Sequence, residues 1–334
     1  MKLFITGIAG FLGSHLANFY LKKGFDVIGN DTLIGGYKDN IPKGVKFYEV
    51  PCEDFKKLKK LFSGVDVVIH TAAYAHEGLS VFSPYTITSN IIGSSVSVFS
   101  AAISANVKRI VHCSSMARYG DIKVPFKEND SVKPVDPYGI AKLASENILI
   151  NLSNVHGIEY NIAIPHNIIG PNQRYDDPFR NVASIMINLM LQNRRPIIYG
   201  DGEQKRSFSD VRDCISCIDI LTTSNEVINQ IVNIGPGDEN YMTINNLFEM
   251  ISNKLKFNQK PIFYPERANE IKHSTCSSEK AENLLGYKTQ HSVSESLDTI
   301  IDYIKKRGPM KFEYNYELEI LNDKTPSTWK DKVF

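Results

Sequence analysis

The chain has 334 residues, of which 42% are hydrophobic and 22% are charged, as is typical of a globular protein with a sizeable core. Its formal net charge is only +1, so no charge excess predicts binding to nucleic acid or to an anionic membrane. No apolar run approaches the roughly 20 residues needed to span a bilayer.

The first half of the chain alternates short apolar runs with helical patterns. Several of the runs are apolar on both faces, as in a parallel sheet covered by helices on each side. This alternation predicts an α/β fold with a Rossmann-type, doubly wound parallel sheet. We expect strands at 2–7, 26–31, 45–50, 65–70, 108–115 and 160–166, and helices near 11–23, 84–106 and 138–154.

The regular alternation ends after about residue 168, where "GPNQRYDDP" has the Gly, Pro and Asp content of a loop. We expect residues 1–167 to form the sheet domain, together with a segment near 208–234. Residues 168–334 would form a smaller α/β lobe that packs on it. The polar stretch at the end of the chain gives no clear pattern.

Five scattered cysteines, an odd number, suggest a reducing compartment and therefore a cytoplasmic protein without disulfides. Cys214 and Cys217 form a C-x-x-C pair, but no second pair of ligands lies near them in the sequence. Two small apolar residues on a helix face are a better interpretation than zinc or redox use.

Three glycines, at 7, 10 and 13, stand between the first predicted strand and the first predicted helix. Without side chains there, the backbone can turn tightly and approach a pyrophosphate at the helix N-terminus. Asp31 ends the second predicted strand, where a carboxylate would bind ribose hydroxyls and repel a 2′-phosphate. The pattern therefore predicts a dinucleotide site for NAD rather than NADP.

Tyr138 and Lys142 lie one turn apart on the third predicted helix, for which Asp136 is placed as the N-cap and Pro137 as the first residue. A cation beside a phenol favours the phenolate and brings the phenol pKa toward the working range. Ser115 ends a strand, where α/β active sites gather. We expect these three residues, Ser115, Tyr138 and Lys142, to be catalytic.

The glycine turn, Asp31, Ser115 and Tyr138-x-x-x-Lys142 together resemble the extended short-chain dehydrogenase/reductase family, in its nucleotide-sugar-modifying branch. The resemblance covers roughly residues 1–305 and is greatest to NAD-dependent UDP-glucose and UDP-N-acetylglucosamine 4-epimerases. It implies an enzyme with bound NAD, a nucleotide-sugar substrate, most simply a UDP-sugar, and a homodimer formed through the two long helices.

The resemblance also implies site residues. Arg206 and Arg267 would bind the substrate diphosphate, Asn167 would touch its phosphate, and Ser274 would leave room for an N-acetyl group. Arg174 and Arg180 could meet a uronate carboxylate or be structural or subunit-surface charges. The implied cofactor contacts, besides Tyr138 and Lys142, are Gly7, Gly10, Phe11, Leu12, Gly13, Asp31, Cys52, Thr71, Ala72, Ala73, Asn90 and Pro165.

The chain departs from the family at two informative places. Pro51 replaces a common Asp near the adenine, and Arg212 replaces a common Asp in the second lobe. After Ser115, the positions that hold acids in the family's dehydratases and decarboxylases are Met116 and Ala117, which cannot transfer protons.

Without an acid in this stretch, the expected chemistry is the simplest in the family: oxidation of a sugar at C4 and re-reduction on the opposite face. Another nucleotide-sugar oxidoreductase, either a C4 dehydrogenase or reductase or a 4,6-dehydratase, is the alternative. A non-enzymatic dinucleotide sensor is disfavoured because Tyr138 and Lys142 are both present. His166 is a further candidate acid or base, against an ordinary histidine at a strand end.

Overall fold

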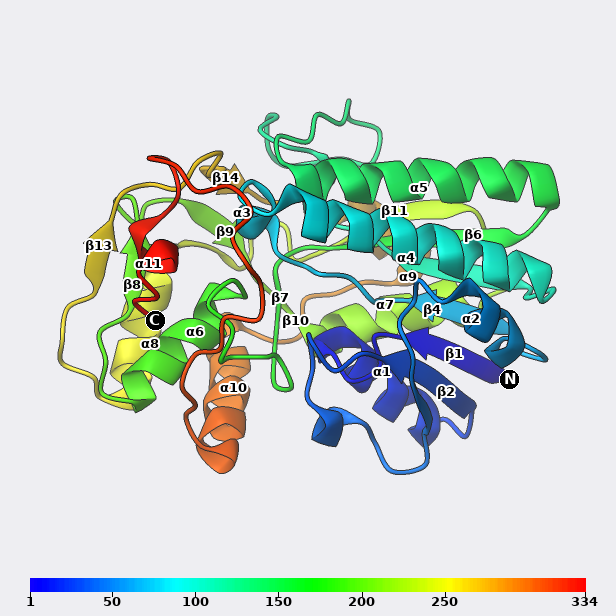
Figure 1. The fold of residues 1–334 in the computed structure, drawn as a ribbon, viewed down its shortest axis with the longest axis horizontal. Coiled ribbons are helices and arrows are strands. Elements are labelled where there is room, and N and C mark those ends of the chain that lie inside the picture. The colour runs from blue at the N-terminus through cyan, green and yellow to red at the C-terminus, as the bar shows by residue number, and fades with distance from the viewer.

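The computed structural model describes residues 1–334, and a seven-stranded parallel sheet forms its centre (Figure 1). All six predicted strands are present, and their ends differ from the predicted ones by no more than a few residues. In spatial order the strands are β11 (Gln230–Ile234), β6 (Glu159–Pro165), β5 (Arg109–Cys113), β4 (Val67–His70), β1 (Lys2–Thr6), β2 (Asp26–Asp31) and β3 (Lys46–Glu49).

Helices cover both faces of this sheet because side chains along each strand alternate between the two faces. In β1, Leu3 and Ile5 belong to one core cluster and Phe4 to the other. The first cluster is covered by α1 (Phe11–Lys22), α7 (Val211–Thr223) and α9 (Glu279–Leu285), and the second by α2 (Phe55–Leu61), α4 (Pro84–Ser104) and α5 (Pro137–His156).

The C-x-x-C pair lies inside this structure rather than at a ligand site. Cys214 and Cys217 are on α7, and both side chains are buried against the sheet in the first cluster. Burial in apolar surroundings raises the pKa of both thiols, and it raises that of Cys217 to about 12. The two residues therefore act as small core side chains, as the sequence suggested.

Helix α5 begins where its sequence predicts. The Asp136 side chain accepts a hydrogen bond from Gly139 N at 2.8 Å, and Pro137 is the first helical residue. A cap of this kind contributes about 1 kcal/mol. The helix ends at His156, and Gly157 after it adopts the left-handed conformation that often terminates a helix. This capping fixes the position of Tyr138, two residues after Asp136.

The second lobe has its own core between three helices, α6 (Val182–Leu191), α8 (Ile244–Leu255) and α10 (Val293–Arg307). The chain between them returns to the first lobe, where α7 and α9 cover the main sheet and β11 extends it. Short strands complete the lobe: β7 (Ile168–Ile169), β8 (Ile197–Tyr199), β9 (Lys205–Ser207), β10 (Ser209–Asp210), β12 (Tyr241–Thr243), β13 (Ile262–Tyr264) and β14 (His273–Ser274).

Helix α4 is the one helix that is long and apolar enough, by length and composition alone, to match a membrane span. In this fold it lies beside α5 on one face of the sheet (Figure 1). Ile91, Val98 and Phe99 on α4 are buried in the protein core. Core packing against the sheet therefore accounts for the apolar character of α4.

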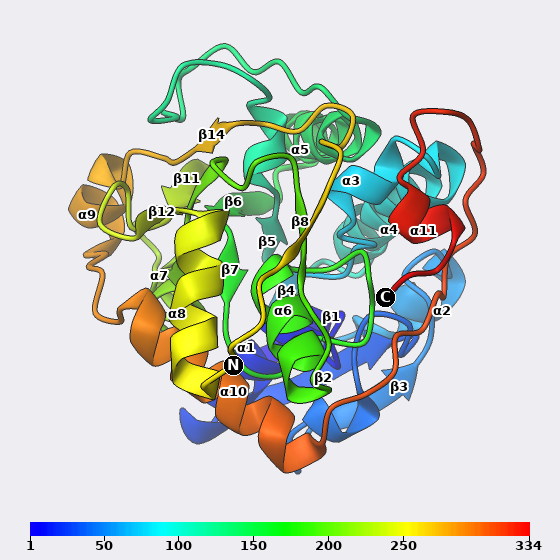
Figure 2. The ribbon, with the colours of Figure 1, turned by 90° about the vertical axis from the view of Figure 1, so that its left-hand side faces the viewer.

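The end of the chain, which the sequence left unplaced, forms an ordered segment over both lobes. Figure 2 shows residues 309–334 running from α10 past α4 to the short helix α11 (Ser327–Lys330). Trp329 is only 3% exposed and packs against Phe82 of the first lobe and Phe179 of the second. We call residues 309–334 the C-terminal segment.

Glu319 of the C-terminal segment supplies the cap that α4 lacks. The side chain of Ser83, at the N-cap position, makes no capping hydrogen bond. Instead the Glu319 carboxylate accepts hydrogen bonds from the backbone N–H groups of Tyr85 and Thr86, both at 2.8 Å. An acidic side chain at this helix end also interacts favourably with the helix dipole.

We predict that Glu319→Ala weakens docking of the C-terminal segment by about 1 kcal/mol, the usual value of a lost helix cap. Trp329 is the only tryptophan in the chain, so its fluorescence reports this docking directly. The emission should move to longer wavelength, and quenching by acrylamide should increase. Glu317→Ala is the matched control, because the exposed Glu317 side chain makes no hydrogen bond and its carbonyl oxygen is unchanged. Identical spectra for the two variants would contradict the capping role.

Candidate active site

A cavity of about 530 Å³ lies between the two lobes, at the carboxyl ends of the sheet strands. Ligands of open α/β sheets bind at this edge, where the strand order reverses, here between β1 and β4. Every residue proposed from the sequence for the cofactor, for catalysis or for the substrate lines this cavity, with the exceptions of Ser274 and the candidate acid or base His166.

The glycine turn closes as tightly as the sequence suggested. Gly7 has a φ of +70°, and a Cβ atom on Gly13 would lie 2.2 Å from the carbonyl oxygen of Gly7. Helix α1 begins at Phe11, after an N-cap glycine that has no capping side chain. The first N–H groups of the helix are therefore left without a side-chain acceptor, as an anion site requires.

Asp31 is held beside this turn by two backbone hydrogen bonds. Its carboxylate accepts from Ala9 N at 3.0 Å and from Leu33 N at 2.7 Å. Burial raises the pKa of Asp31, and these hydrogen bonds oppose the increase. The carboxylate is thus fixed at the end of β2, where it fits a ribose diol.

The remaining proposed cofactor contacts form the walls around the turn. Asn90 holds the strand-end loop through its amide, which accepts from Tyr74 N at 2.9 Å and donates to Glu53 at 2.8 Å. Asn30 donates to the Cys52 sulfur at 3.3 Å, and burial raises the pKa of Cys52 to about 12, so it stays a neutral thiol. Pro51, Thr71, Ala72, Ala73 and Pro165 also line the cavity.

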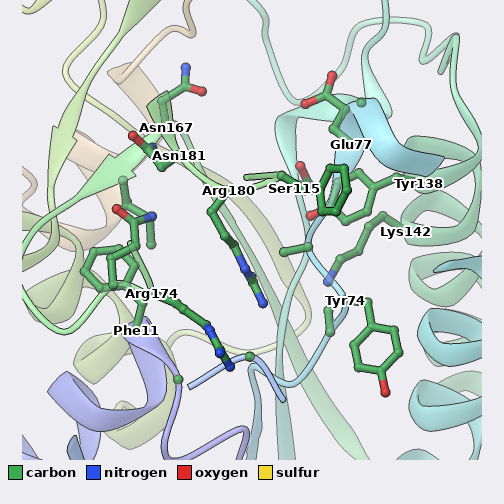
Figure 3. Close-up of a pocket in the computed structure, with 18 of the residues that line it drawn as sticks. Phe11, Tyr74, Glu77, Ser115, Tyr138, Lys142, Asn167, Arg174, Arg180 and Asn181 are labelled. Carbon is green, nitrogen blue, oxygen red and sulfur yellow. The ribbon is translucent and has the colours of Figure 1, made fainter. Parts of the chain in front are cut away.

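Tyr138 and Lys142 project from α5 into the cavity near Ser115 (Figure 3). The Lys142 amino group lies 6.0 Å from the centre of the Tyr138 ring and donates to the Cys113 carbonyl at 2.9 Å. Burial lowers the pKa of Lys142 to about 8. Burial also raises the pKa of Tyr138, while the Ser115 side chain lowers it. The three residues are thus brought together as an interacting group.

Arg206 and Arg267 meet at a single carboxylate, although they lie far apart in the sequence. Glu270 accepts from Arg206 at 2.9 Å through one oxygen and from Arg267 at 2.6 Å through the other. Two guanidinium groups that share one anionic partner form an electropositive site suited to a diphosphate. Asn167 lies on the same side of the cavity, and its amide donates to Ser207 O at 3.2 Å.

Ser274 and His166 are not on the cavity wall. Ser274 is buried, and its hydroxyl group contacts the sulfur of Met116 at 3.0 Å, so it reaches the cavity only through Met116. His166 is fully buried near Phe126, and burial lowers its pKa to about 4. A neutral histidine outside the cavity is not placed to transfer a proton to a ligand there, so His166 fits the ordinary strand-end interpretation.

Comparison with known proteins identifies the family. Residues 3–235 match the model of the NAD dependent epimerase/dehydratase family. The chain belongs to this family. Both lines of evidence, the family match and the fit of the glycine turn and Asp31 to a dinucleotide, make it an NAD-dependent enzyme.

Its relatives include two 4-epimerases of known structure and one putative 4-epimerase. A putative UDP-glucose 4-epimerase of Methanocaldococcus jannaschii is 33% identical over 92% of this chain and 99% of its own. The structures of Thermotoga maritima UDP-glucose 4-epimerase with UDP-glucose and of Methanobrevibacter ruminantium UDP-N-acetylglucosamine 4-epimerase with UDP-N-acetylmuramic acid are each 29% identical. Both cover 92% of this chain and 99% of theirs, with TM-scores of 0.86 and 0.84.

The cavity of this family member also holds an acid that the sequence analysis missed, Glu77. It lies in the four-residue helix α3 (Glu77–Ser80), near Tyr138 (Figure 3), and its carboxylate makes no hydrogen bond within the protein. Burial and the nearby Asp136 carboxylate raise the pKa of Glu77 to about 7, against the effect of Arg206 and Arg267. The segment "HEGLS" has no pattern that would have placed this side chain in the site.

We predict that Glu77→Gln lowers the pH of the acidic limb of kcat/KM by roughly half a pH unit. The reason is that a carboxylate near Tyr138 raises the pKa of its phenol, and a neutral amide removes that effect. The catalytic phenolate then persists to lower pH. Glu266→Gln, an exposed residue outside the cavity, is the control. An acidic limb that stays in place or moves to higher pH would contradict this coupling.

Proposed function

We propose that this protein is a nucleotide-sugar 4-epimerase that acts on a UDP-hexose or a UDP-N-acetylhexosamine. The observation that carries the proposal is the group formed by Ser115, Tyr138 and Lys142 in a cavity that also holds a two-arginine anion site. The three 4-epimerase relatives, which match nearly their full length, support the same activity.

Each residue of the site has a definite task in this reaction. Tyr138, as the phenolate, accepts the proton of the sugar C4 hydroxyl and becomes the neutral phenol, and Lys142 stabilises the phenolate before this transfer. Ser115 donates or accepts a hydrogen bond at the same sugar oxygen. The bound cofactor supplies hydride acceptance and return at C4. Arg206 and Arg267 hold the diphosphate while the oxidised sugar turns to present its other face.

The proposed range of sugars follows from Ser274. This residue is small and lies behind Met116, whose unbranched side chain can change shape more readily than a ring. A bulky aromatic residue at this position would press Met116 into the cavity. The small residue therefore favours a cavity that admits an N-acetyl group as well as a hydroxyl group at the sugar C2.

Glu77 supports one alternative, a 4,6-dehydratase. Elimination of water requires an acid and a base in addition to the tyrosine, and the positions after Ser115 supply neither, since they are Met116 and Ala117. Glu77 could supply one of the two from α3. Loss of water needs both an acid and a base, and Glu77 alone can supply only one of them. The epimerase therefore remains the better proposal.

We predict that Tyr138→Phe loses about 10²- to 10⁴-fold in kcat, because the variant keeps the shape of the site but loses the proton-transfer group. UDP-glucose and UDP-N-acetylglucosamine should be converted by the wild type to products of unchanged mass, with no net change in nicotinamide absorbance. Mass spectrometry and NMR of the products provide the measurement. Tyr85→Phe, on the exposed surface of α4, is the matched control.

Other products would overturn the proposal. A product that has lost one water molecule would establish the dehydratase alternative. Stoichiometric reduction of added NAD would establish a dehydrogenase. Full activity of Tyr138→Phe would show that the phenol is not the proton-transfer group.

A homodimer formed through α4 and α5 is a further part of the proposal. The outer surface of these helices carries apolar side chains, with Tyr85 77%, Ile140 53% and Val155 68% exposed. Pairing the two helices with those of a second copy would cover them in a four-helix interface.

We predict that Ala144→Glu, one turn from Ile140 on α5, converts the dimer to a monomer, since it introduces a charge next to Ile140 on the apolar surface. Light scattering coupled to gel filtration gives the molar mass directly. Asn253→Glu on the exposed face of α8, which adds the same charge to the second lobe, should leave the mass unchanged. A wild-type protein that elutes as a monomer would refute the dimer.

A further inference from the structure

Arg180 is a second-lobe residue whose side chain reaches the first lobe. It directly precedes Asn181, the N-cap of α6, and its side chain runs into the cavity toward the space between Phe11 and Lys142 (Figure 3). The tip of the side chain lies against the loop that follows β2: a Cβ atom on Gly35 would lie 2.7 Å from Nη2 of Arg180. No other residue type at position 35 would leave the guanidinium group in this place.

The loop that Arg180 touches is packed on the glycine turn. A Cβ atom on Gly36 would lie 2.2 Å from the carbonyl oxygen of Ala9 and 2.6 Å from Gly10 N. The same loop is held from the second lobe by Arg174, which donates to Ile34 O at 2.6 Å. The guanidinium group of Arg180 therefore lies beside the turn that forms the anion site of α1.

Two of the three nitrogen atoms of this guanidinium group have no partner in the protein. Nε donates to Asp177 at 3.2 Å, whereas Nη1 and Nη2 make no hydrogen bond, although the side chain is only 14% exposed. Arg174 differs, because it is fully engaged with Asp176, Ile34 O and Glu313. A mostly buried cation that is paired through one nitrogen and keeps two free donor groups can bind a further anion.

The part of the dinucleotide that Arg180 would meet can be inferred from the residues at the two ends of the cofactor site. Asp31 marks the ribose of the adenosine half, and Tyr138 with Lys142 marks the nicotinamide half. Arg180 contacts Gly35 near the first end, and its charge lowers the pKa of Tyr138 at the second. Its guanidinium group thus lies between the two ends, where a dinucleotide carries its diphosphate.

We propose that Arg180 binds the diphosphate of NAD from the second lobe, while the N-terminus of α1 binds it from the first. Asp177 is a positioning residue in this arrangement: it is buried, it accepts from Nε, and it leaves the two Nη groups free for phosphate oxygens. The cofactor is then held by both lobes and stays bound through turnover.

The test compares ligands that do or do not carry the diphosphate. We expect Arg180→Met to weaken binding of NAD and of ADP-ribose by about 10- to 100-fold, the effect of losing hydrogen bonds to a charged partner. Binding of adenosine, which has no phosphate, should be unchanged. Calorimetry gives the three affinities, and the NAD content of the purified enzyme should fall in parallel. Arg195→Met, an exposed arginine outside the cavity, is the matched control for the lost charge.

A second variant keeps the positive charge of Arg180 but displaces its guanidinium group. Gly35→Ala places a methyl group against the guanidinium tip, and Gly35 has no positive φ that would disfavour alanine. It should weaken binding of NAD and ADP-ribose without affecting adenosine, and it should add little in the Arg180→Met background, because both changes act on one contact. This variant distinguishes a local effect from a folding defect in Arg180→Met.

Three results would overturn the proposal. Unchanged affinity for NAD together with weakened binding of UDP-glucuronate alone would assign Arg180 to a substrate carboxylate. Equal weakening of all three ligands in both variants would assign it a structural role. Additive losses in the double variant would show that Gly35 and Arg180 act independently. None of these readouts requires the enzyme to be an epimerase, so the inference can fail while the proposed function holds.

Discussion

The reversal of strand order between β1 and β4 is the constraint on which the site depends. The connection after β1 runs to β2 on one side, whereas the later connection runs to β4 on the other side. The two connections diverge at the carboxyl ends of β1 and β4, so no helix covers these strand ends. The glycine turn, the end of β5 and the start of α5 all meet at this uncovered edge. The second lobe covers this edge of the sheet, and the space between the two lobes forms the cavity.

Charge in this cavity is arranged in pairs before any ligand binds. Glu270 holds Arg206 and Arg267, and Asp177 holds Arg180. These carboxylates fix long cationic side chains in one geometry, so less conformational freedom is lost when phosphate groups bind. Lys142 is the exception, since its partner is a neutral carbonyl oxygen. Burial lowers the pKa of Lys142 because its charged form is poorly solvated and has no anionic partner. A phenolate at Tyr138 would be such a partner, so each charge would stabilise the other in the proposed reaction.

The C-terminal segment joins the two lobes around this cavity. Glu319 caps α4 in the first lobe, whereas Glu313 pairs with Arg174 and the Val333 carbonyl accepts from Arg194 in the second. The aromatic ring of Trp329 packs between side chains of both lobes, and Phe334 lines the cavity. Contacts of this kind hold the lobes at a fixed separation, on which a bridging residue such as Arg180 depends.

Local patterns were enough to predict six of the seven strands of the main sheet, the three long helices at 11–23, 84–106 and 138–154, and the glycine turn, because each follows from periodicity or from a turn over a few residues. Asp136 and Pro137 marked the start of α5 and so placed Tyr138 and Lys142 on one face. The missing acids after Ser115 could also be seen in the chain alone.

Contacts between segments that are far apart in the sequence could not be predicted from local patterns. Glu77 lies on a helix of four residues with no periodicity, and the shared Glu270 appears only when β9 and the loop before β14 come together. Ser274 was expected on the cavity wall and lies behind Met116 instead. The order of the C-terminal segment likewise depends on the surfaces it covers. Spacing along the chain determines local geometry, whereas packing between the lobes determines which loops meet, and that packing leaves no repeating signal in the sequence.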